Sequence, residues 1–293
     1  MSDPLGRKDY VAAGPIAVII GCGGMGMSVA RALGKRHPLL VVDIDEGRLA
    51  EAERSLLLEG YSIQTRACDI TNSSETRALG EALKGGPGVK ALLHVAAVAK
   101  SIGSWKKLID IDLVGAQLIA DAVGPHMVKG GVAILISSLA SYLPPADPRI
   151  DMLLDEPMAA GFYDGLAAIH GSEPDMDWAY NYAKLGINRL AERLAVEWAG
   201  REVRALSLSP GMIDSPMARA EGETLPAHDG TQERKTRAEK AQENPLRREG
   251  SLLEITSVVD FLASDAASFL NGIDVAVDGG HRAFWRRTGI TQR

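Results

Sequence analysis

Short apolar runs alternate along this chain with longer segments whose apolar residues recur at helical spacing. The apolar runs predict seven strands, at residues 16–20, 39–43, 62–67, 89–95, 132–137, 203–209 and 273–278. The segments between them predict helices at residues 24–36, 46–59, 73–84, 104–128, 180–200 and 252–264. Runs as apolar as "IAVII" suit strands that are covered on both faces, as in a parallel sheet. The alternation therefore predicts an α/β domain with a doubly wound sheet and right-handed crossovers.

Two long polar segments interrupt this alternation. Residues 143–177 contain five prolines and eight acidic side chains against a single arginine, and residues 214–250 form a second polar segment that ends in "NPLRREG". Connections of this length in a compact domain are usually functional loops or disordered segments. We therefore expect a single domain with an insertion at 143–177, a substrate loop at 214–250, an N-terminal extension at 1–14 and a C-terminal tail at 281–293.

A glycine-rich turn, "GCGGMG", follows the first predicted strand and opens the first predicted helix. Gly21, Gly23 and Gly26 fit the pattern G-x-G-x-x-G, and Gly21, Gly24 and Gly26 also fit G-x-x-G-x-G. Glycines in this context allow a tight turn and let the backbone approach a pyrophosphate at the start of the helix. We therefore predict that the turn, with Met25 inside it, binds a dinucleotide; the alternative is an ordinary cluster of loop glycines.

Asp43 supports the dinucleotide interpretation because it ends the strand that follows this helix, where a carboxylate can bind a ribose hydroxyl. Its charge would repel a 2′-phosphate, and no arginine adjoins the turn, so NAD is expected rather than NADP. The alternative for Asp43 is a solvated acidic side chain. Cys22 is either a reactive thiol at the start of the helix or a small residue tolerated in the turn.

Composition and charge narrow the classes of function. The chain has 293 residues, of which 46% are hydrophobic and 24% charged, and its net charge of -6 gives no basic footprint for nucleic acid. The first fifteen residues lack the layout of a signal peptide, and no apolar run approaches the roughly 20 residues that span a bilayer. Two cysteines, Cys22 and Cys68, fit a reducing compartment better than a disulfide framework. We expect a cytoplasmic protein with no metal site and no nucleic-acid or membrane partner.

The stretch "WAYNYAKLG" carries a candidate acid/base pair. Tyr180 and Lys184 are four residues apart, so they lie on one face of the predicted helix. A nearby ammonium stabilises a phenolate and lowers the pKa of a tyrosine, which makes it a usable acid/base near neutral pH. Chance often produces such a pair, so its meaning depends on its context. Tyr182 points elsewhere around the helix and is predicted to pack in the core.

The context is a strand that runs into Ser138 in "ILISSLAS" and a later strand that runs into "PGMIDSPM". With these motifs in this order, the chain resembles the short-chain dehydrogenase/reductase family over residues 15–280, including a closing "DFLASDAASFLNGIDVAVDGG". The resemblance implies that Ser138 hydrogen-bonds the substrate oxygen and that Tyr180 passes the proton. Lys184 would favour the tyrosine phenolate and hold the nicotinamide ribose, while hydride moves between substrate and nicotinamide.

The same resemblance assigns further residues to the cofactor. Asp69, with Ile70 beside it, would contact the adenine; Asp69 could also lie in the cap region of the next helix, and the two interpretations are compatible. The remaining cofactor contacts are expected from the end of the fourth strand and from the loop over the nicotinamide, namely Ala96, Ala97, Pro210, Gly211, Ile213 and Ser215, the last standing where a threonine is usual.

Three departures separate this chain from the family pattern. The glycine turn is one residue shorter, and the usual Asn-Asn-Ala-Gly run is "HVAA", in which His94 is expected to be a strand-end residue or a cofactor-side contact. The catalytic asparagine, expected three residues before Gly115, is Asp112. An ionised Asp112 could accept the same hydrogen bonds, but its charge would oppose the lysine and move the optimum for alcohol oxidation to alkaline pH. Asp112 could also be a tolerated replacement.

Ser138 lies 42 positions before Tyr180, and the family commonly separates these residues by far fewer. The segment 143–177 is thus inserted beside the active site, a layout similar to that of a bacterial 3α-hydroxysteroid dehydrogenase/carbonyl reductase group. It could roof a pocket for an apolar alcohol or ketone opposite Met212, Met217 and the 214–250 loop, or form a packing or oligomer-interface element. The apolar residues expected in such a roof are Met152, Leu153, Leu154, Met158, Phe162, Tyr163 and Leu166.

Taken together, these features predict a single Rossmann-type domain with about seven parallel strands and a helical insertion near the active site. The predicted function is NAD(H)-dependent interconversion of an apolar secondary alcohol and its ketone, with hydroxysteroids among the candidate substrates. We expect a homodimer or homotetramer paired through the helices near 104–128 and 180–200. The alternatives are a non-catalytic dinucleotide-binding sensor or scaffold with this fold and, less favoured, an epimerase or dehydratase.

Overall fold

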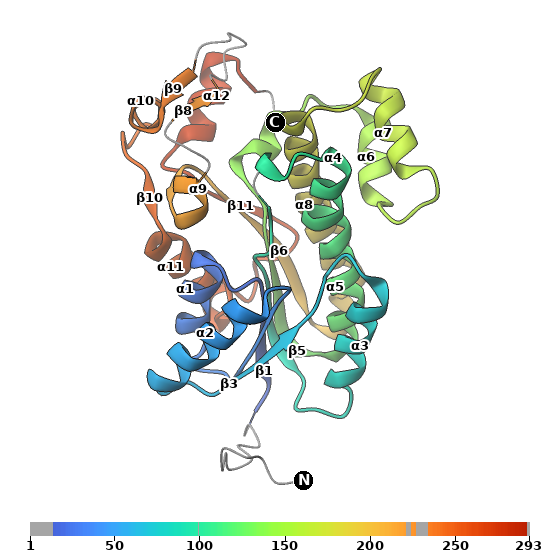
Figure 1. Cartoon of the computed structure of the whole chain (residues 1–293), viewed down its shortest axis with the longest axis vertical. Coiled ribbons are helices and arrows are strands. Elements are labelled where there is room, and N and C mark those ends of the chain that lie inside the picture. Colours follow the sequence, from blue (N-terminus) through green and yellow to red (C-terminus); the bar gives the residue numbers. More distant parts are fainter. Residues whose placement is uncertain (1–13, 99, 221–223, 227–233, 292–293) are drawn as a thin grey trace.

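Seven parallel strands form the central sheet of the protein (Figure 1). The computed structural model describes residues 14–98, 100–220, 224–226 and 234–291, so nearly all of the expected N-terminal extension lies outside the described residues. The spatial order is β3-β2-β1-β4-β5-β6-β11, as expected for a doubly wound fold. The strands are β1 (Ile16–Ile20), β2 (Leu39–Asp43), β3 (Ile63–Ala67), β4 (Val89–His94), β5 (Met127–Ile136), β6 (Arg204–Pro210) and β11 (Asp274–Val277).

Helices cover both faces of this sheet, which explains why its central strands are largely apolar, whereas β3 at the sheet edge carries Gln64, Thr65 and Arg66. In β1, Ala17 and Ile19 belong to one hydrophobic cluster, and Val18 and Ile20 belong to the cluster on the opposite face. Figure 1 shows α1, α2 and α11 on one side and α3, α5 and α8 on the other. Their bounds are α1 (Gly24–Leu33), α2 (Glu46–Leu58), α3 (Ser73–Leu83), α5 (Gly115–Val123), α8 (Met176–Glu197) and α11 (Leu252–Leu262).

A π-helical turn interrupts the α-helix predicted at 104–128. The helix begins as α4 (Trp105–Ile109), continues as one π-helical turn at Asp110–Val114, and ends as α5. A π-turn fits one extra residue into a helix and commonly marks a functional site. Apolar periodicity does not reveal it, since the pattern continues through the turn. Its consequence is local: Asp112, inside the turn, is buried in the protein interior.

The insertion forms two helices, of which α6 packs against α8 and α7 packs against α6 (Figure 1). These are α6 (Pro148–Asp155) and α7 (Phe162–His170). Leu154, Phe162 and Leu166 are buried in the main hydrophobic core. Arg189 of α8 pairs with the carboxylates of Asp151 and Asp155 at 3.3 and 2.5 Å, respectively. The insertion is therefore an extension of the core on the α4 and α8 side.

The substrate loop adds a small layer at the carboxyl ends of the strands. β7 (Ile213–Asp214) pairs with β10 (Gly250–Ser251), and β8 (Thr224–Pro226) pairs with β9 (Arg234–Thr236). The helices of this region are α9 (Pro216–Ala220), α10 (Arg237–Glu243) and, in the C-terminal tail, α12 (His281–Thr288). Across the described ranges, no helix combines the length and the apolar character needed to cross a membrane.

His94 ends β4 and is 1% exposed. Burial, followed by the nearby Lys184 ammonium, lowers the pKa of His94 to about 3. An unfolded histidine titrates near pH 6.5, so between these values the unfolded chain binds a proton that the folded chain does not. The stability that this neutral imidazole contributes is present above about pH 6.5 and is lost as the pH falls toward 3.

We predict that His94→Asn flattens the acid limb of the stability curve. The free energy of unfolding of the wild type should fall between pH 7 and pH 4 by on the order of a few kcal/mol more than that of the variant. Urea denaturation at both pH values measures the difference, with the partly exposed His126→Asn as the matched control. Equal pH dependence in wild type and His94→Asn would contradict the assignment of a buried neutral imidazole.

We predict that Leu166→Ala destabilises the fold by about 2–5 kcal/mol, because Leu166 is fully buried and its truncation leaves a cavity in the hydrophobic core. Met152→Ala, on the same insertion, should change the free energy of unfolding by less than about 0.5 kcal/mol since Met152 is largely exposed. Denaturant unfolding of both variants checks this. Similar small effects would show that the insertion is not part of the core.

Candidate active site

A cavity of about 910 Å³ opens at the carboxyl ends of the central strands, around the point between β1 and β4 where the strand order reverses. Open α/β sheets bind their ligands at this point. The chain folds so that every residue predicted to bind the cofactor lines this one cavity. Those residues are Gly21, Gly23, Gly24, Met25, Gly26, Asp43, Asp69, Ile70, Ala96, Ala97, Tyr180, Lys184, Pro210, Gly211, Ile213 and Ser215.

The glycines of the turn have different roles. Gly21 has a φ of +96°, and a Cβ there would lie 2.8 Å from the backbone nitrogen of Ala96. A Cβ on Gly26 would lie 1.9 Å from the carbonyl oxygen of Gly21, so the fold itself requires both glycines. A Cβ on Gly24 would contact Pro216 of the substrate loop, whereas one on Gly23 would meet no atom within 4 Å. Gly23, the N-cap of α1, is therefore the position that leaves room for a phosphate.

Asp43 is fixed by the glycine turn beside it. Its carboxylate accepts hydrogen bonds from the backbone of Cys22 at 2.8 Å and of Asp45 at 3.0 Å. A carboxylate has about four acceptor sites, so it can still bind ribose hydroxyls. Burial and then the Asp43 carboxylate raise the pKa of the Cys22 thiol to about 12, which leaves it neutral and does not support a reactive thiol. Arg48, which we did not predict at this site, lines the cavity and pairs with Asp45 at 3.4 Å.

Asp69 shapes the turn after β3. Its Oδ1 accepts hydrogen bonds from the backbone and the hydroxyl of Thr71, at 2.9 and 2.7 Å. Asn72, not Asp69, caps helix α3 by accepting from the backbone of Ser74. Asp69 therefore shapes the turn that precedes α3, and Asn72 is the cap of that helix. Burial raises the pKa of the neighbouring Cys68 thiol to about 11, so this thiol is also neutral.

The predicted catalytic residues Ser138, Tyr180 and Lys184 line the same cavity. Tyr180 and Lys184 lie one turn apart on α8, with the Lys184 ammonium 5.6 Å from the centre of the Tyr180 ring. Ser138 follows β5, and its hydroxyl oxygen accepts a hydrogen bond from the backbone of Ala140 at 3.2 Å. Ser137 donates to the carbonyl oxygen of Lys184 at 2.8 Å, which connects the serine strand to the catalytic helix.

Tyr182, as predicted, packs in the core. It is 5% exposed, and its ring centre lies 4.2 Å from that of Trp178.

Asp112 lies beneath the catalytic helix. One oxygen of its carboxylate accepts a hydrogen bond from the backbone of Val98 at 3.0 Å, and the other lies 3.0 Å from the Lys184 ammonium. The side chains of Lys184 and Asp112 are 3% and 0% exposed, so solvent screens this ion pair very little. Burial disfavours the ammonium, but the Asp112 carboxylate, with Tyr180 adding to it, outweighs burial and raises the pKa of Lys184; burial also raises the pKa of Asp112, against the opposing effect of the Lys184 ammonium. The lysine therefore stays charged although it is buried.

Arg237, the first residue of α10, connects several parts of the substrate loop beside the cavity. Its guanidinium pairs with Glu249 at 2.5 Å and donates to the carbonyl oxygens of Ala218 and Ile213 at 3.0 and 3.4 Å. Arg237 was not among the site residues predicted from the sequence. The capping box formed by Thr236 and Glu239 is a sequence signal that could have located the start of α10, although not its position over the cavity.

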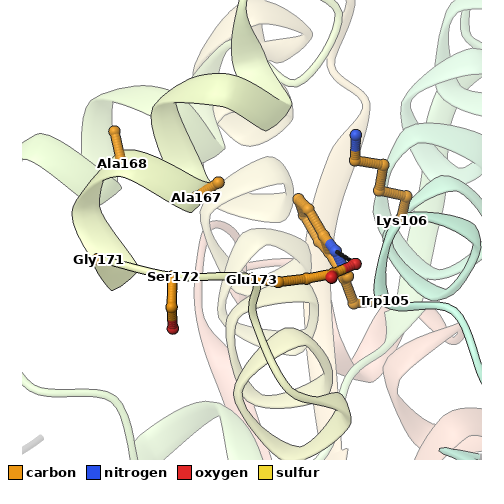
Figure 2. A pocket seen from close by; sticks show the side chains of 7 residues that line it. All are labelled: Trp105, Lys106, Ala167, Ala168, Gly171, Ser172 and Glu173. Carbon is orange, nitrogen blue, oxygen red and sulfur yellow. Dashed lines mark hydrogen bonds between the residues drawn. The ribbon is translucent and has the colours of Figure 1, made fainter.

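The prediction that the insertion roofs the cavity is wrong for the described residues. No residue of 143–177 lines the main cavity, and its two exposed methionines, Met152 and Met158, do not contribute to a roof. The side chain of Met217 lies outside the described residues. The insertion instead borders a separate pocket of about 480 Å³ between α4 and α7, where Trp105 donates to the Glu173 carboxylate at 3.3 Å (Figure 2).

Comparison with known proteins gives consistent matches along the chain. The family model described as short chain dehydrogenase matches residues 15–147, and the one described as enoyl-(acyl carrier protein) reductase matches residues 165–282. The short-chain dehydrogenase/reductase bsc3 of Alternaria brassicicola is 26% identical over 274 residues, which cover 92% of this chain and 96% of that protein. The cis-4-hydroxycyclohexanecarboxylate dehydrogenase of Sinomonas cyclohexanicum is 28% identical over 285 residues, covering 92% and 96%, respectively.

Solved structures show the same fold. A short-chain type dehydrogenase/reductase from Mycobacterium ulcerans superposes with a TM-score of 0.72 at 23% identity and covers 92% of this chain and 90% of its own. Relatives named as dehydrogenases and reductases match over nearly the full length of the chain. The chain therefore belongs to the short-chain dehydrogenase/reductase family, a family of oxidoreductases that use a nicotinamide cofactor.

Proposed function

We propose that this protein is an NAD(H)-dependent oxidoreductase that interconverts a secondary alcohol and its ketone. The observation that carries the proposal is the shared cavity: Ser138, Tyr180 and Lys184 line the same space as the glycine turn and Asp43. A module that only binds a dinucleotide needs the turn and the aspartate but not the other three residues. Ser138, Tyr180 and Lys184 share the cavity with the predicted nicotinamide loop, which supports a reaction beside the cofactor.

Each of the three residues has a distinct task. The phenolate of Tyr180 takes the proton from the alcohol during oxidation, and the Tyr180 hydroxyl gives a proton to the ketone oxygen during reduction. The Ser138 hydroxyl donates a hydrogen bond to the substrate oxygen and orients it toward the tyrosine. The Lys184 ammonium stabilises the phenolate of Tyr180 and is positioned to bind a ribose hydroxyl. When bound, the nicotinamide supplies or accepts the hydride, which is the part of the chemistry that side chains cannot provide.

NAD is the proposed cofactor because of the charge at the ribose end of the cavity. The Asp43 carboxylate would accept hydrogen bonds from ribose hydroxyls, and it would repel a 2′-phosphate. The position of Arg48 favours NADP, since its side chain lines this end of the cavity. Its guanidinium, however, pairs with the Asp45 carboxylate. Measuring turnover with both cofactors at equal concentration tests the preference.

The proposed substrate is an apolar secondary alcohol or its ketone. Met212, Pro216 and Ala218 of the substrate loop face the cavity together with Ile111 of the π-turn. The 3α-hydroxysteroid dehydrogenase/carbonyl reductase group has an insertion at the same place in the sequence, between the catalytic serine and tyrosine. By analogy with that group, we include hydroxysteroids among the candidate substrates. The relative named for cis-4-hydroxycyclohexanecarboxylate adds cyclic hydroxy acids to the compounds worth testing. We also propose a cytoplasmic homodimer or homotetramer.

We predict that Tyr180→Phe lowers alcohol oxidation by at least about 100-fold while NAD binding remains, because the proton acceptor is lost and the cavity keeps its shape. NADH formation with a panel of hydroxysteroids, cyclic alcohols and other hydrophobic secondary alcohols measures this, together with NAD binding by calorimetry. Tyr182→Phe, two residues away and packed in the core, is the matched control and should retain turnover.

Two outcomes would contradict the proposal. Tyr180→Phe with turnover equal to that of the wild type would show that the tyrosine is not the acid/base. NAD binding by the wild type without turnover of any compound in the panel, in either direction, would favour a dinucleotide-binding sensor or scaffold. The substitution of Asp112 for the usual asparagine and the buried His94 are the departures that make this second candidate worth testing.

A further inference from the structure

A second lysine lies over the ring of Tyr180. Lys100 belongs to the short 3-10 helix Lys100–Ile102 that follows β4, and its ammonium lies 5.0 Å from the centre of the ring. The Lys184 ammonium lies 5.6 Å from the same centre. The two lysines come from different elements and differ in exposure, since the Lys100 side chain is 38% exposed and that of Lys184 only 3%. The proposed acid/base is thus flanked by two positive charges.

Each lysine has an acidic partner, but the two pairs differ in environment. Lys184 and Asp112 form a fully buried ion pair, so the carboxylate offsets much of the charge that the lysine presents to Tyr180. Lys100 forms an ion pair with Asp177 in the first turn of α8, and the Asp177 side chain is 56% exposed. Water and salt screen an exposed partner more strongly than a buried one. Lys100 therefore adds a second positive charge close to Tyr180, and solvent screens both its pairing with Asp177 and its effect on the ring.

Two further titratable groups in this region, His94 and Lys240, do not supply the positive charge that Lys100 places near Tyr180. His94, behind Lys184, is neutral because burial and the lysine lower its pKa. Lys240 of α10 faces Lys100 and Asp177 from the substrate loop. Burial, with Lys100 and Lys235 adding to it and Glu243 and Asp177 opposing it, lowers the pKa of Lys240 to about 8. The positive charge of Lys100 thus contributes to lowering the pKa of Lys240.

We propose that Lys100 is a positioning residue for the acid/base step, whose ammonium stabilises the phenolate of Tyr180, and that Asp177 moderates this effect. The physical basis is the attraction of a cation to the electron-rich face of an aromatic ring, which is stronger when the ring carries the negative charge of a phenolate. Alcohol oxidation needs the phenolate, and ketone reduction needs the neutral hydroxyl. The inference rests on the proposed function of Tyr180 and assigns it a second electrostatic partner.

The test compares the pH dependence of alcohol oxidation in four variants. Lys100→Met should move the pH midpoint of kcat/KM toward alkaline pH by about one unit, so that activity falls about tenfold below the midpoint and recovers above it. Lys100→Arg keeps the charge and should restore the wild-type midpoint. Asp177→Asn removes the opposing charge and should move the midpoint in the acidic direction. Lys106→Met is the matched control, since that ammonium lies over the Trp105 and Tyr163 rings, at 5.4 and 5.8 Å.

A second measurement does not depend on turnover. The tyrosinate absorbance of Tyr180, obtained as the difference between each variant and the same variant carrying Tyr180→Phe, should titrate with the same order of midpoints. Wild-type midpoints in Lys100→Met, or a loss of activity that is equal at every pH, would overturn the inference, because either result assigns Lys100 no effect on the phenolate. Lys100→Gln provides a second neutral variant if Lys100→Met does not fold.

The two measurements separate this inference from the proposed function. If the wild type turns over no alcohol, the proposed function fails, and the tyrosinate titration alone decides whether Lys100 stabilises the phenolate. If the wild type is active and Tyr180→Phe is not, the proposed function holds, and an unchanged midpoint in Lys100→Met overturns only the role of Lys100.

Discussion

The buried ion pair between Lys184 and Asp112 is the interaction on which the arrangement of the site depends. Removing one partner of such a pair leaves an unpaired charge in the interior, at a cost of about 3–5 kcal/mol. The pair joins three parts of the molecule: α8 carries the lysine, the π-turn carries the aspartate, and the segment after β4 donates a backbone hydrogen bond to the aspartate. Because both side chains are buried, small displacements of any of these parts would weaken the pair.

The ion pair also sets the electrostatics of the proposed acid/base. A lysine alone beneath Tyr180 would present its full charge to the phenolate, but Asp112 at 3.0 Å offsets it. The same carboxylate keeps the lysine protonated although burial opposes its charge. Lys100, whose side chain is more exposed than that of Lys184, supplies a second positive charge near the same ring. The site therefore combines a buried, compensated lysine with a surface lysine that can act on the same ring.

Much of the fold could be predicted from the sequence, for a physical reason. The sheet is covered on both faces, so its central strands are largely apolar and stand out from the helices between them. The cofactor residues could be located because they follow strands, and parallel strands bring their carboxyl ends to one edge. The π-turn was missed since the apolar pattern runs through it without a change; the backbone of Asp110–Val114 shows it.

The insertion and the substrate loop were harder to predict for a different reason. Periodicity shows that a helix has an apolar face but not which neighbour covers it, so Phe162 and Leu166 could have faced a pocket or the core; they face the core. Arg237 reaches the cavity only because a long polar loop folds back over it, and nothing local in the sequence specifies that distance. Long-range placement of this kind depends on tertiary contacts.

The pH dependence of alcohol oxidation in Asp112→Asn, compared with the wild type, tests the central claim most directly. If an ionised Asp112 offsets the charge of Lys184, its replacement by the neutral amide should move the pH midpoint of kcat/KM toward acidic pH, by about one unit. A midpoint that is unchanged, or that moves to higher pH, would contradict the account, since it would show that the carboxylate does not oppose the formation of the Tyr180 phenolate.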